Sequence, residues 1–232
     1  MIPVIVCICI AALVTIILNY NGYVEFYHPL NKAQDGQIRV ACVGDSITYG
    51  CTVKNRRKKS YPAVLSDLLG DKYCVNNYGY TNRTAIKTAD FPYVKMKLYQ
   101  KSLDFQPDIV IIMLGANDSK KINWNREKFV RDYSEIIESY LSLPSAPKVY
   151  VLECLPMFEI NGKVKWQLIK DVTEKEINPA VKQIADETGV SFVSLCDAFE
   201  DKAHLFTDGV HPNSEGSELL AKIIHQSVFL DK

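Results

Sequence analysis

The segment Asp108 to Leu114 reads DIVIIML, and if it forms a strand, both of its faces are apolar. Such a strand is buried on both faces, as in the middle of a parallel sheet covered by helices. Four further apolar runs of strand length occur: 38–43, 73–78, 148–152 and 190–195. Segments with helical spacing separate or follow them: 60–69, 84–103, 125–143, 166–188 and 214–228. This alternation predicts an α/β fold with a five-stranded parallel sheet between two helical layers.

Glycine and proline set the expected ends and breaks of the helices. Gly70 and Gly189 follow helical segments, as is common just beyond a helix C-terminus. Pro92 is expected to break or kink the segment 84–103, and Pro179 to interrupt 166–188. Residues 156–165 are expected to form an irregular loop.

The N-terminus differs from the rest of the chain, because Ile2 to Leu18 is a run of 17 residues without a charge. A bilayer core of ~30 Å needs ~20 apolar residues, with a lower limit near ~17. We therefore expect an anchor at 1–18, a linker at 19–37 and one α/β domain at 38–230. A cleaved secretory signal is the alternative, although no Lys or Arg precedes the run. Either reading makes the chain membrane-anchored or secreted, with an extracytoplasmic body.

Charge and cysteine content narrow the possible partners. Lys+Arg and Asp+Glu both total 27, so a neutral chain gives no electrostatic case for nucleic-acid binding. The basic run 56–59 is read as a solvated loop, with contact to an anionic substrate or lipid as the alternative. No cysteine or histidine cluster has zinc spacing.

Cys51 and Cys74 are candidates for a disulfide if the body is exported. The oligomeric state is left open.

Small and polar residues follow the expected strands. They are Gly44-Asp45-Ser46, Gly79-Tyr80-Thr81-Asn82, Gly115-Ala116-Asn117-Asp118 and, after the last strand, Asp208-Gly209-Val210-His211. In α/β sheets of this kind, ligands bind outside the carboxyl ends of the strands. These segments are therefore expected to meet at one edge of the sheet.

Within this set, Ser46 and His211 form the candidate for nucleophilic catalysis. A serine hydroxyl needs a neighbouring base to remove its proton. Of the four histidines we favour His211, because Asp208 lies three residues before it on a loop just before a helix. Asp208 can then accept from Nδ1 and leave Nε2 facing Ser46.

These segments together resemble the SGNH, or GDSL, hydrolase superfamily. VGDSITYG (43–50) resembles the nucleophile block, and VNNYGYTNRT (75–84) the block with a glycine. IIMLGANDS (111–119) resembles the Gly-x-Asn-Asp block, and FTDGVHPNSEG (206–216) the Asp-x-x-His block. The resemblance spans roughly 38–228 and implies a flavodoxin-like α/β/α sandwich.

The resemblance also implies a role for each residue. Ser46 is the nucleophile, His211 the general base, and Asp208 the residue that orients His211. The oxyanion is expected to be held by the Ser46 and Gly79 backbone N–H groups and the Asn117 amide. Asp45 and Asp118 are expected to hold loops, and no metal or organic cofactor is implied.

The resemblance is greatest to the carbohydrate acetylesterase branch, so removal of O-acetyl groups from a sugar or glycan is the favoured activity. A lysophospholipase or thioesterase is the alternative, and a silent glycan-binding module on a membrane stalk is an alternative of another class. A flavodoxin-like nucleotide-binding protein is disfavoured because Asp45 would repel phosphate. Asn82 and Asn117 lie in glycosylation sequons that we read as chance matches. The aromatic candidates for stacking on a sugar are Tyr49, Tyr80, Trp124 and Trp166.

Overall fold

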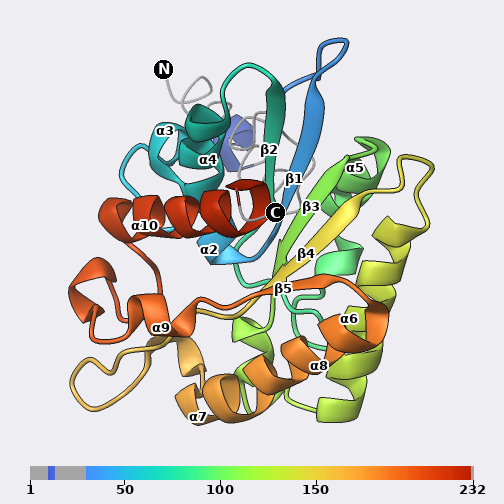
Figure 1. Cartoon of the computed structure of the whole chain (residues 1–232). Coiled ribbons are helices and arrows are strands. Elements are labelled where there is room, and N and C mark those ends of the chain that lie inside the picture. Colours follow the sequence, from blue (N-terminus) through green and yellow to red (C-terminus); the bar gives the residue numbers. More distant parts are fainter. Residues whose placement is uncertain (1–9, 14–29, 231–232) are drawn as a thin grey trace.

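The computed structural model describes residues 10–13 and 30–230. A sheet of five parallel strands in the order β2-β1-β3-β4-β5 lies at its centre (Figure 1). The strands are β1 (Ile38–Gly44), β2 (Tyr73–Gly79), β3 (Ile109–Met113), β4 (Lys148–Leu152) and β5 (Ser191–Val193). The predicted α/β fold with a five-stranded parallel sheet is confirmed.

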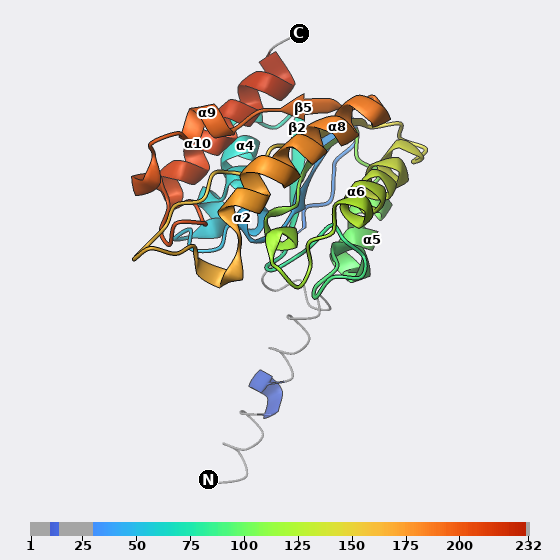
Figure 2. The ribbon, with the colours of Figure 1, turned by 90° about the horizontal axis from the view of Figure 1, so that it is seen from below.

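Helices cover both faces of this sheet (Figure 1, Figure 2). They are α2 (Ser46–Tyr49), α3 (Arg56–Lys59), α4 (Tyr61–Leu69), α5 (Lys97–Asp104), α6 (Arg126–Leu141), α7 (Lys170–Val172), α8 (Asn178–Thr188), α9 (Cys196–Phe199) and α10 (Ser214–His225). Helices α5, α6 and α8 pack on one face, and α4, α9 and α10 pack on the other. The molecule therefore has three layers.

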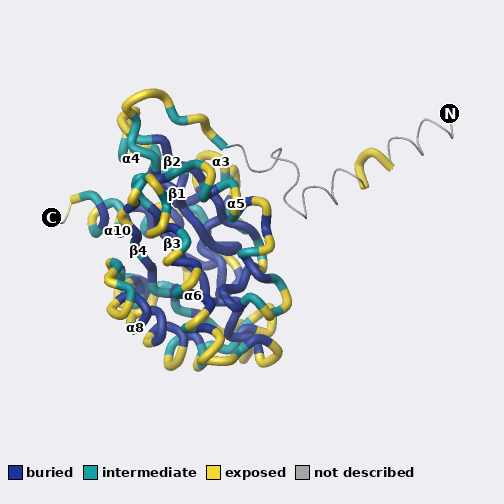
Figure 3. Tube along the Cα trace, turned by 90° about the vertical axis from the view of Figure 1, so that its right-hand side faces the viewer, coloured by how far each residue is buried: buried dark blue, intermediate teal, exposed yellow. Residues whose placement is uncertain are grey.

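The central strands supply side chains to both helical layers. In β3, Val110 and Ile112 pack with α5, α6 and α8, whereas Ile111 and Met113 pack with α4 and α10. Successive side chains of a strand point to opposite faces. All four side chains are buried, and the strands form the buried centre in Figure 3. Burial on both sides explains why this segment contains no polar side chain.

The predicted helix 84–103 is wrong over its first half. Residues 81–91 make a loop, a 3₁₀ turn follows at Tyr93–Lys95, and the α-helix α5 begins only at Lys97. The carboxylate of Asp118 accepts the N–H groups of Ala85 and Ile86, at 3.0 and 2.9 Å. These buried bonds replace those that a helix would make, and Pro92 then prevents a helix from continuing.

The predicted helix 166–188 begins later than expected. Trp166 and Gln167 have φ of +65° and +61°, in the left-handed region. Non-glycine residues adopt that region at a steric cost, and it interrupts a right-handed helix. The helical segment therefore starts at Lys170 and continues through a π-helical turn (Thr173–Ile177) into α8.

The predicted anchor falls mostly outside the described residues, of which only 10–13 belong to it. Among the residues that the structure describes, no helix is long and apolar enough to cross a membrane. The described part of the predicted linker lies against the domain. Asn31 donates its N–H to Asn76 Oδ1 at 2.7 Å and accepts from Asn76 Nδ2 at 3.0 Å. Residues of this segment thus make contacts with strand β2.

Substitution of Gly79 by alanine is expected to destabilise the fold. A Cβ at this position would lie 2.3 Å from the Tyr49 nitrogen and 2.6 Å from the Thr48 carbonyl carbon. Because these are backbone atoms of α2, the helix must shift, at a cost of about 1–3 kcal/mol in the free energy of unfolding. Urea denaturation measures this, with the exposed Lys72→Ala as a control that changes stability by less than about 0.5 kcal/mol. Wild-type stability of Gly79→Ala would contradict the close packing.

Candidate active site

Ser46 lies where strand β1 ends and helix α2 begins. The Asp45 carboxylate accepts the Ile47 N–H at 3.0 Å and caps the helix. A Cβ on Gly44 would lie 2.2 Å from Thr48 Oγ1, so glycine allows α2 to approach the sheet. This approach places Ser46 at the carboxyl edge of the sheet.

His211 reaches Ser46 from a loop 165 residues further along the chain. Its Nε2 lies 2.9 Å from Ser46 Oγ, and its Nδ1 lies 2.8 Å from Asp208 Oδ2. The other oxygen of Asp208 accepts the backbone N–H groups of Val210 and His211, at 3.1 and 2.8 Å. The structure therefore brings the three predicted catalytic residues together, in the arrangement expected of a nucleophile, its base and an orienting carboxylate.

The environment of Asp208 keeps it charged. Burial by itself raises the pKa of this carboxyl, but the hydrogen bonds from the His211 backbone N–H, the His211 ring and the Val210 N–H outweigh burial. The pKa of Asp208 therefore lies below its ordinary value. A carboxylate in this position stabilises the positive charge that His211 gains on taking a proton.

A narrow pocket opens beside the Ser46 hydroxyl. It is lined by Ser46, Ile47, Asn82, Ala116, Asn117, Trp166, Leu168, Val210 and His211. Its volume is about 10 Å³, close to that needed for a single water molecule. The walls therefore leave room for a small group next to the nucleophile.

The model of the GDSL-like lipase/acylhydrolase family matches residues 42–219, a range that includes Ser46, Asp208 and His211. The chain belongs to this family. The family assignment confirms the resemblance drawn from the four sequence blocks. It also removes the basis for the nucleotide-binding alternative.

Relatives of this GDSL-family chain include named esterases. An acetylxylan esterase of Xylanibacter ruminicola is 33% identical over 84% of this chain, and the chain spans only 44% of that protein. The structure is similar to Est24, a carbohydrate acetylesterase of Sinorhizobium meliloti, with a TM-score of 0.67, 22% identity and coverage of 83% and 98% of the two chains. It is also similar to an aryl esterase of M. smegmatis, with a TM-score of 0.66, 21% identity and coverage of 83% and 98%. The two structural matches support the fold of this GDSL-family domain.

Gly79 does not lie where the predicted oxyanion site requires. It is not among the residues that line the pocket, and its N–H donates to Asn77 Oδ1 at 2.9 Å. A Cβ at Gly79 would collide with the backbone of α2, so glycine serves helix packing at this position. The structure therefore does not bring the Gly79 N–H into the pocket beside Ser46.

Asn82 occupies the place on the pocket wall that Gly79 was expected to take. Its φ is +63°, a left-handed conformation that asparagine tolerates better than most residues. From the sequence, Asn82 belongs to the polar segment expected at the sheet edge and to a sequon, and no role at the site was predicted for it. A usable signal existed in the polar loop after β2, but which of its residues faces the pocket depends on this backbone conformation.

Asn117 lies on the pocket wall as predicted, held by two hydrogen bonds. Its Nδ2 donates to Asp45 Oδ2 at 3.1 Å and to the Arg83 carbonyl at 3.2 Å. The amide is therefore fixed in orientation before a substrate arrives. A substrate oxygen there has to share these hydrogens or replace one acceptor.

Two buried carboxyl groups support the loops around Ser46. Burial raises the pKa of Asp45 to about 6 and that of Asp118 to about 7, although backbone hydrogen bonds partly oppose the effect. Asp45 holds Ile47 and Asn117, and Asp118 holds the 81–91 loop. Their contacts are those of groups that hold loops.

Of the four aromatic candidates for sugar stacking, Trp166 lines the pocket. Tyr80 is buried, and Tyr49 has the Arg56 guanidinium 3.8 Å above its ring. The Trp124 indole N–H donates to Glu176 at 2.8 Å, outside the pocket. Among the residues considered, Trp166 is therefore placed to contact a substrate.

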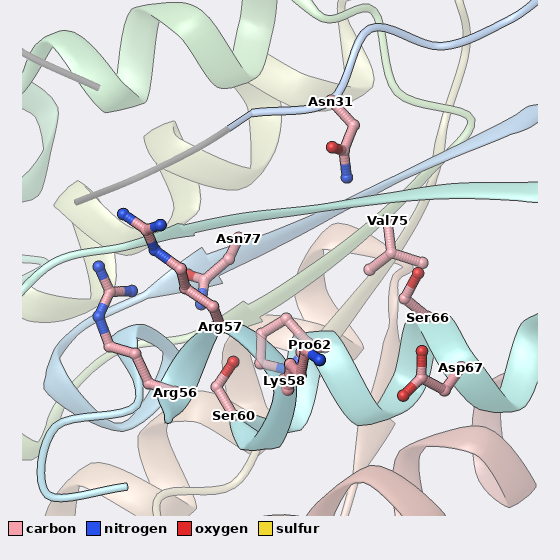
Figure 4. Close-up of a pocket in the computed structure, with 11 residues that line it drawn as sticks. Asn31, Arg56, Arg57, Lys58, Ser60, Pro62, Ser66, Asp67, Val75 and Asn77 are labelled. Carbon is pink, nitrogen blue, oxygen red and sulfur yellow. The ribbon is translucent and has the colours of Figure 1, made fainter. Parts of the chain in front are cut away.

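The remaining candidates do not line the pocket beside Ser46. Cys51 and Cys74 are both free thiols, and no metal-binding group of three or more ligands occurs among the described residues. Part of the basic run lines a separate cavity of about 450 Å³ between α3, α4 and β2 (Figure 4). Its lining contains neither Ser46 nor His211, so this larger cavity does not hold the catalytic residues.

Replacing Asp118 with asparagine is expected to flatten the pH dependence of stability. The folded protein binds the Asp118 proton up to about pH 7, whereas the unfolded chain releases it near its ordinary pKa of 3.8. The contribution of Asp118 to the free energy of unfolding therefore falls as the pH rises through this window.

The expected decline from Asp118 between pH 5 and pH 8 is about 2–3 kcal/mol. Urea denaturation of wild type and Asp118→Asn at both pH values measures it. The change in the free energy of unfolding between the two pH values is compared, so a loss of stability that is equal at both pH values does not affect the result. The exposed Asp71→Asn serves as control. An unchanged pH slope in Asp118→Asn would show that Asp118 is not the source.

Proposed function

We propose that the protein is a serine ester hydrolase that removes small acyl groups, chiefly acetyl, from a carbohydrate. The observation that carries the proposal is the chain of contacts from Ser46 Oγ to His211 Nε2, at 2.9 Å, and from His211 Nδ1 to Asp208, at 2.8 Å. A hydroxyl in this arrangement can lose its proton to the ring as it attacks.

The reaction proceeds through an acyl-enzyme. Ser46 Oγ bonds to the ester carbonyl carbon while its proton passes to His211 Nε2. The carbonyl electron pair moves onto its oxygen, which faces the Ser46 N–H and the Asn117 amide. Collapse breaks the ester C–O bond, and His211 returns the proton to the departing sugar hydroxyl. Water then attacks the acyl carbon with His211 as base, releasing acetic acid and restoring Ser46.

The pocket supports a small acyl group. Its volume of about 10 Å³ leaves no room for an alkyl chain unless Trp166, Leu168 or Val210 moves. An acetyl group needs space for a single methyl beside the reacting carbon. The names of two relatives, an acetylxylan esterase and a carbohydrate acetylesterase, agree with this size.

The alcohol side of the proposed substrate is a sugar. Trp166 is 58% exposed, which is unusual for so large an apolar side chain, and it stands at the pocket mouth. An exposed aromatic face beside a reacting centre can pack against the C–H face of a sugar ring. Because the chain is 33% identical to an acetylxylan esterase over 84% of its length, acetylated xylan is one candidate substrate.

The proposal includes membrane association, or secretion, through residues 2–18. It rests on their sequence, which has no charge over 17 residues. Such a segment would place the hydrolase at or beyond the membrane surface, where polysaccharides are found.

Hydrolysis of p-nitrophenyl esters of increasing chain length tests the reaction and the acyl preference together. We expect kcat/KM to fall at least about tenfold from acetate to octanoate, because each longer chain must displace a pocket wall. Ser46→Ala and His211→Ala are each expected to lower kcat by about 10⁴-fold or more without loss of fold. Ser66→Ala, a serine outside the pocket, is the matched control and should retain full activity.

Other outcomes would redirect the proposal. Preference for long acyl chains would favour a lysophospholipase or thioesterase. A folded protein without esterase activity would favour the silent glycan-binding module. Full activity in Ser46→Ala would refute the assignment of the nucleophile.

Replacing Asn117 with alanine is expected to lower kcat about 10²–10³-fold with little change in KM. The amide is a preorganised donor that gains strength as negative charge develops on the substrate oxygen. Steady-state kinetics with p-nitrophenyl acetate, and a circular dichroism melt to verify folding, measure this. A pure rise in KM would instead place Asn117 in ground-state binding.

A further inference from the structure

Asp208 receives a hydrogen bond from outside the predicted triad. The Trp166 indole N–H donates to Asp208 Oδ2 at 3.1 Å, on the same oxygen that pairs with His211 Nδ1. With the two backbone N–H groups on Oδ1, the carboxylate has four donors. Four donors fill the hydrogen-bonding capacity of a carboxylate, so Trp166 completes the set that fixes its plane.

Trp166 also borders the base. Its ring meets the His211 ring edge-on, with centroids 6.2 Å apart and planes at 67°. Its remaining surface is exposed at the pocket mouth. One side chain therefore touches the carboxylate, the base and the space that a substrate enters.

Trp166 is carried by a segment that spans the catalytic loops. We call residues 158–169 the arm. At its first end, the Phe158 N–H donates to the Gly209 carbonyl at 2.8 Å, where a Cβ on Gly209 would lie 2.1 Å from the Phe158 oxygen. At its other end, the Ile169 N–H donates to Ser119 Oγ at 3.0 Å. The arm thus joins the Asp208–His211 loop to the loop that carries Asn117.

Between these ends the arm has little support from regular structure. Asn161 and Gly162, with φ of +54° and +73°, form the tight turn of a short hairpin. Trp166 and Gln167 both have positive φ, which costs energy for side chains of their size. Contacts with the rest of the domain must therefore hold Trp166 in place, and its hydrogen bond to Asp208 is one of these contacts.

We propose that Trp166 is a positioning residue of the triad whose exposed ring also seats the sugar of the substrate. A sugar packed on the ring holds the indole where it donates to Asp208, so that binding the alcohol part of the ester orders the base. This inference rests on the proposed function and adds a link between the substrate and the carboxylate.

The decisive variants separate the donor from the ring. Trp166→Phe keeps an aromatic face and removes the N–H, whereas Trp166→Ala removes both. Trp124→Phe is the matched control, because its indole bonds to Glu176 outside the pocket. Kinetics are measured with p-nitrophenyl acetate and with an acetylated xylo-oligosaccharide, in the full chain.

We expect Trp166→Phe to lower kcat about tenfold on both esters, as for loss of a hydrogen bond to a charged group, with KM unchanged. Trp166→Ala should in addition raise KM for the oligosaccharide alone. In an Asp208→Asn background, Trp166→Phe should have much less effect, since the carboxylate that it positions is gone.

Three results would overturn the inference. The first is a wild-type kcat in Trp166→Phe, and the second is an equal reduction of kcat by Trp166→Phe with and without Asp208→Asn. The third is an equal change of KM on both esters in Trp166→Ala. Absence of any ester hydrolysis by the wild type would instead refute the proposed function. In that case the fluorescence of Trp166 still tests its contact with a sugar. The chain has two tryptophans, so a Ser46→Ala, Trp124→Phe variant reports Trp166 alone, and added oligosaccharide should change its emission. An unchanged emission would refute sugar contact.

Discussion

The close contact of helix α2 with the ends of strands β1 and β2 determines where the nucleophile lies. Gly44 and Gly79 face each other across these strands, and a Cβ on either would overlap atoms of α2. Because both positions lack a side chain, a helix of one turn fits against the sheet edge and presents Ser46. The loop carrying Asn117 follows the neighbouring strand β3, and the loop that precedes α10 brings His211 to Ser46. Packing in the fold thus precedes and fixes the geometry of the reaction.

Three buried aspartates near this helix differ in pKa because they accept different numbers of hydrogen bonds. Asp208 has enough hydrogen-bond donors to keep its pKa low despite burial, so it remains an anion beside His211. In Asp45 and Asp118 burial dominates, and both pKa values rise toward neutrality. The last two groups lower stability when they ionise, yet they hold Asn117 and the 81–91 loop. The pocket is therefore built partly at the expense of stability near neutral pH.

The sheet and the triad could be predicted because their signals are local. An apolar strand followed by Gly-Asp-Ser, and an aspartate three residues before a histidine, are each visible within a few positions. The loop after β2 was predicted less well, because its structure depends on partners far along the chain. Asp118 draws residues 85 and 86 out of the expected helix, and the positive φ of Asn82 turns that residue toward the pocket. Neither the partner nor the conformation can be seen in the segment itself.

The arm and the sheet edge are held by different kinds of contact. Acyl transfer needs only the groups at the strand ends, whose positions follow from close packing and tolerate little change. The arm is held at its two ends and has no helical or strand periodicity between them, so its sequence can vary without loss of the sheet. Yet Trp166 lies both at the pocket mouth and on Asp208. Under the proposal for Trp166, a change in the arm therefore alters which alcohol is accepted and, through the same side chain, how firmly the base is held.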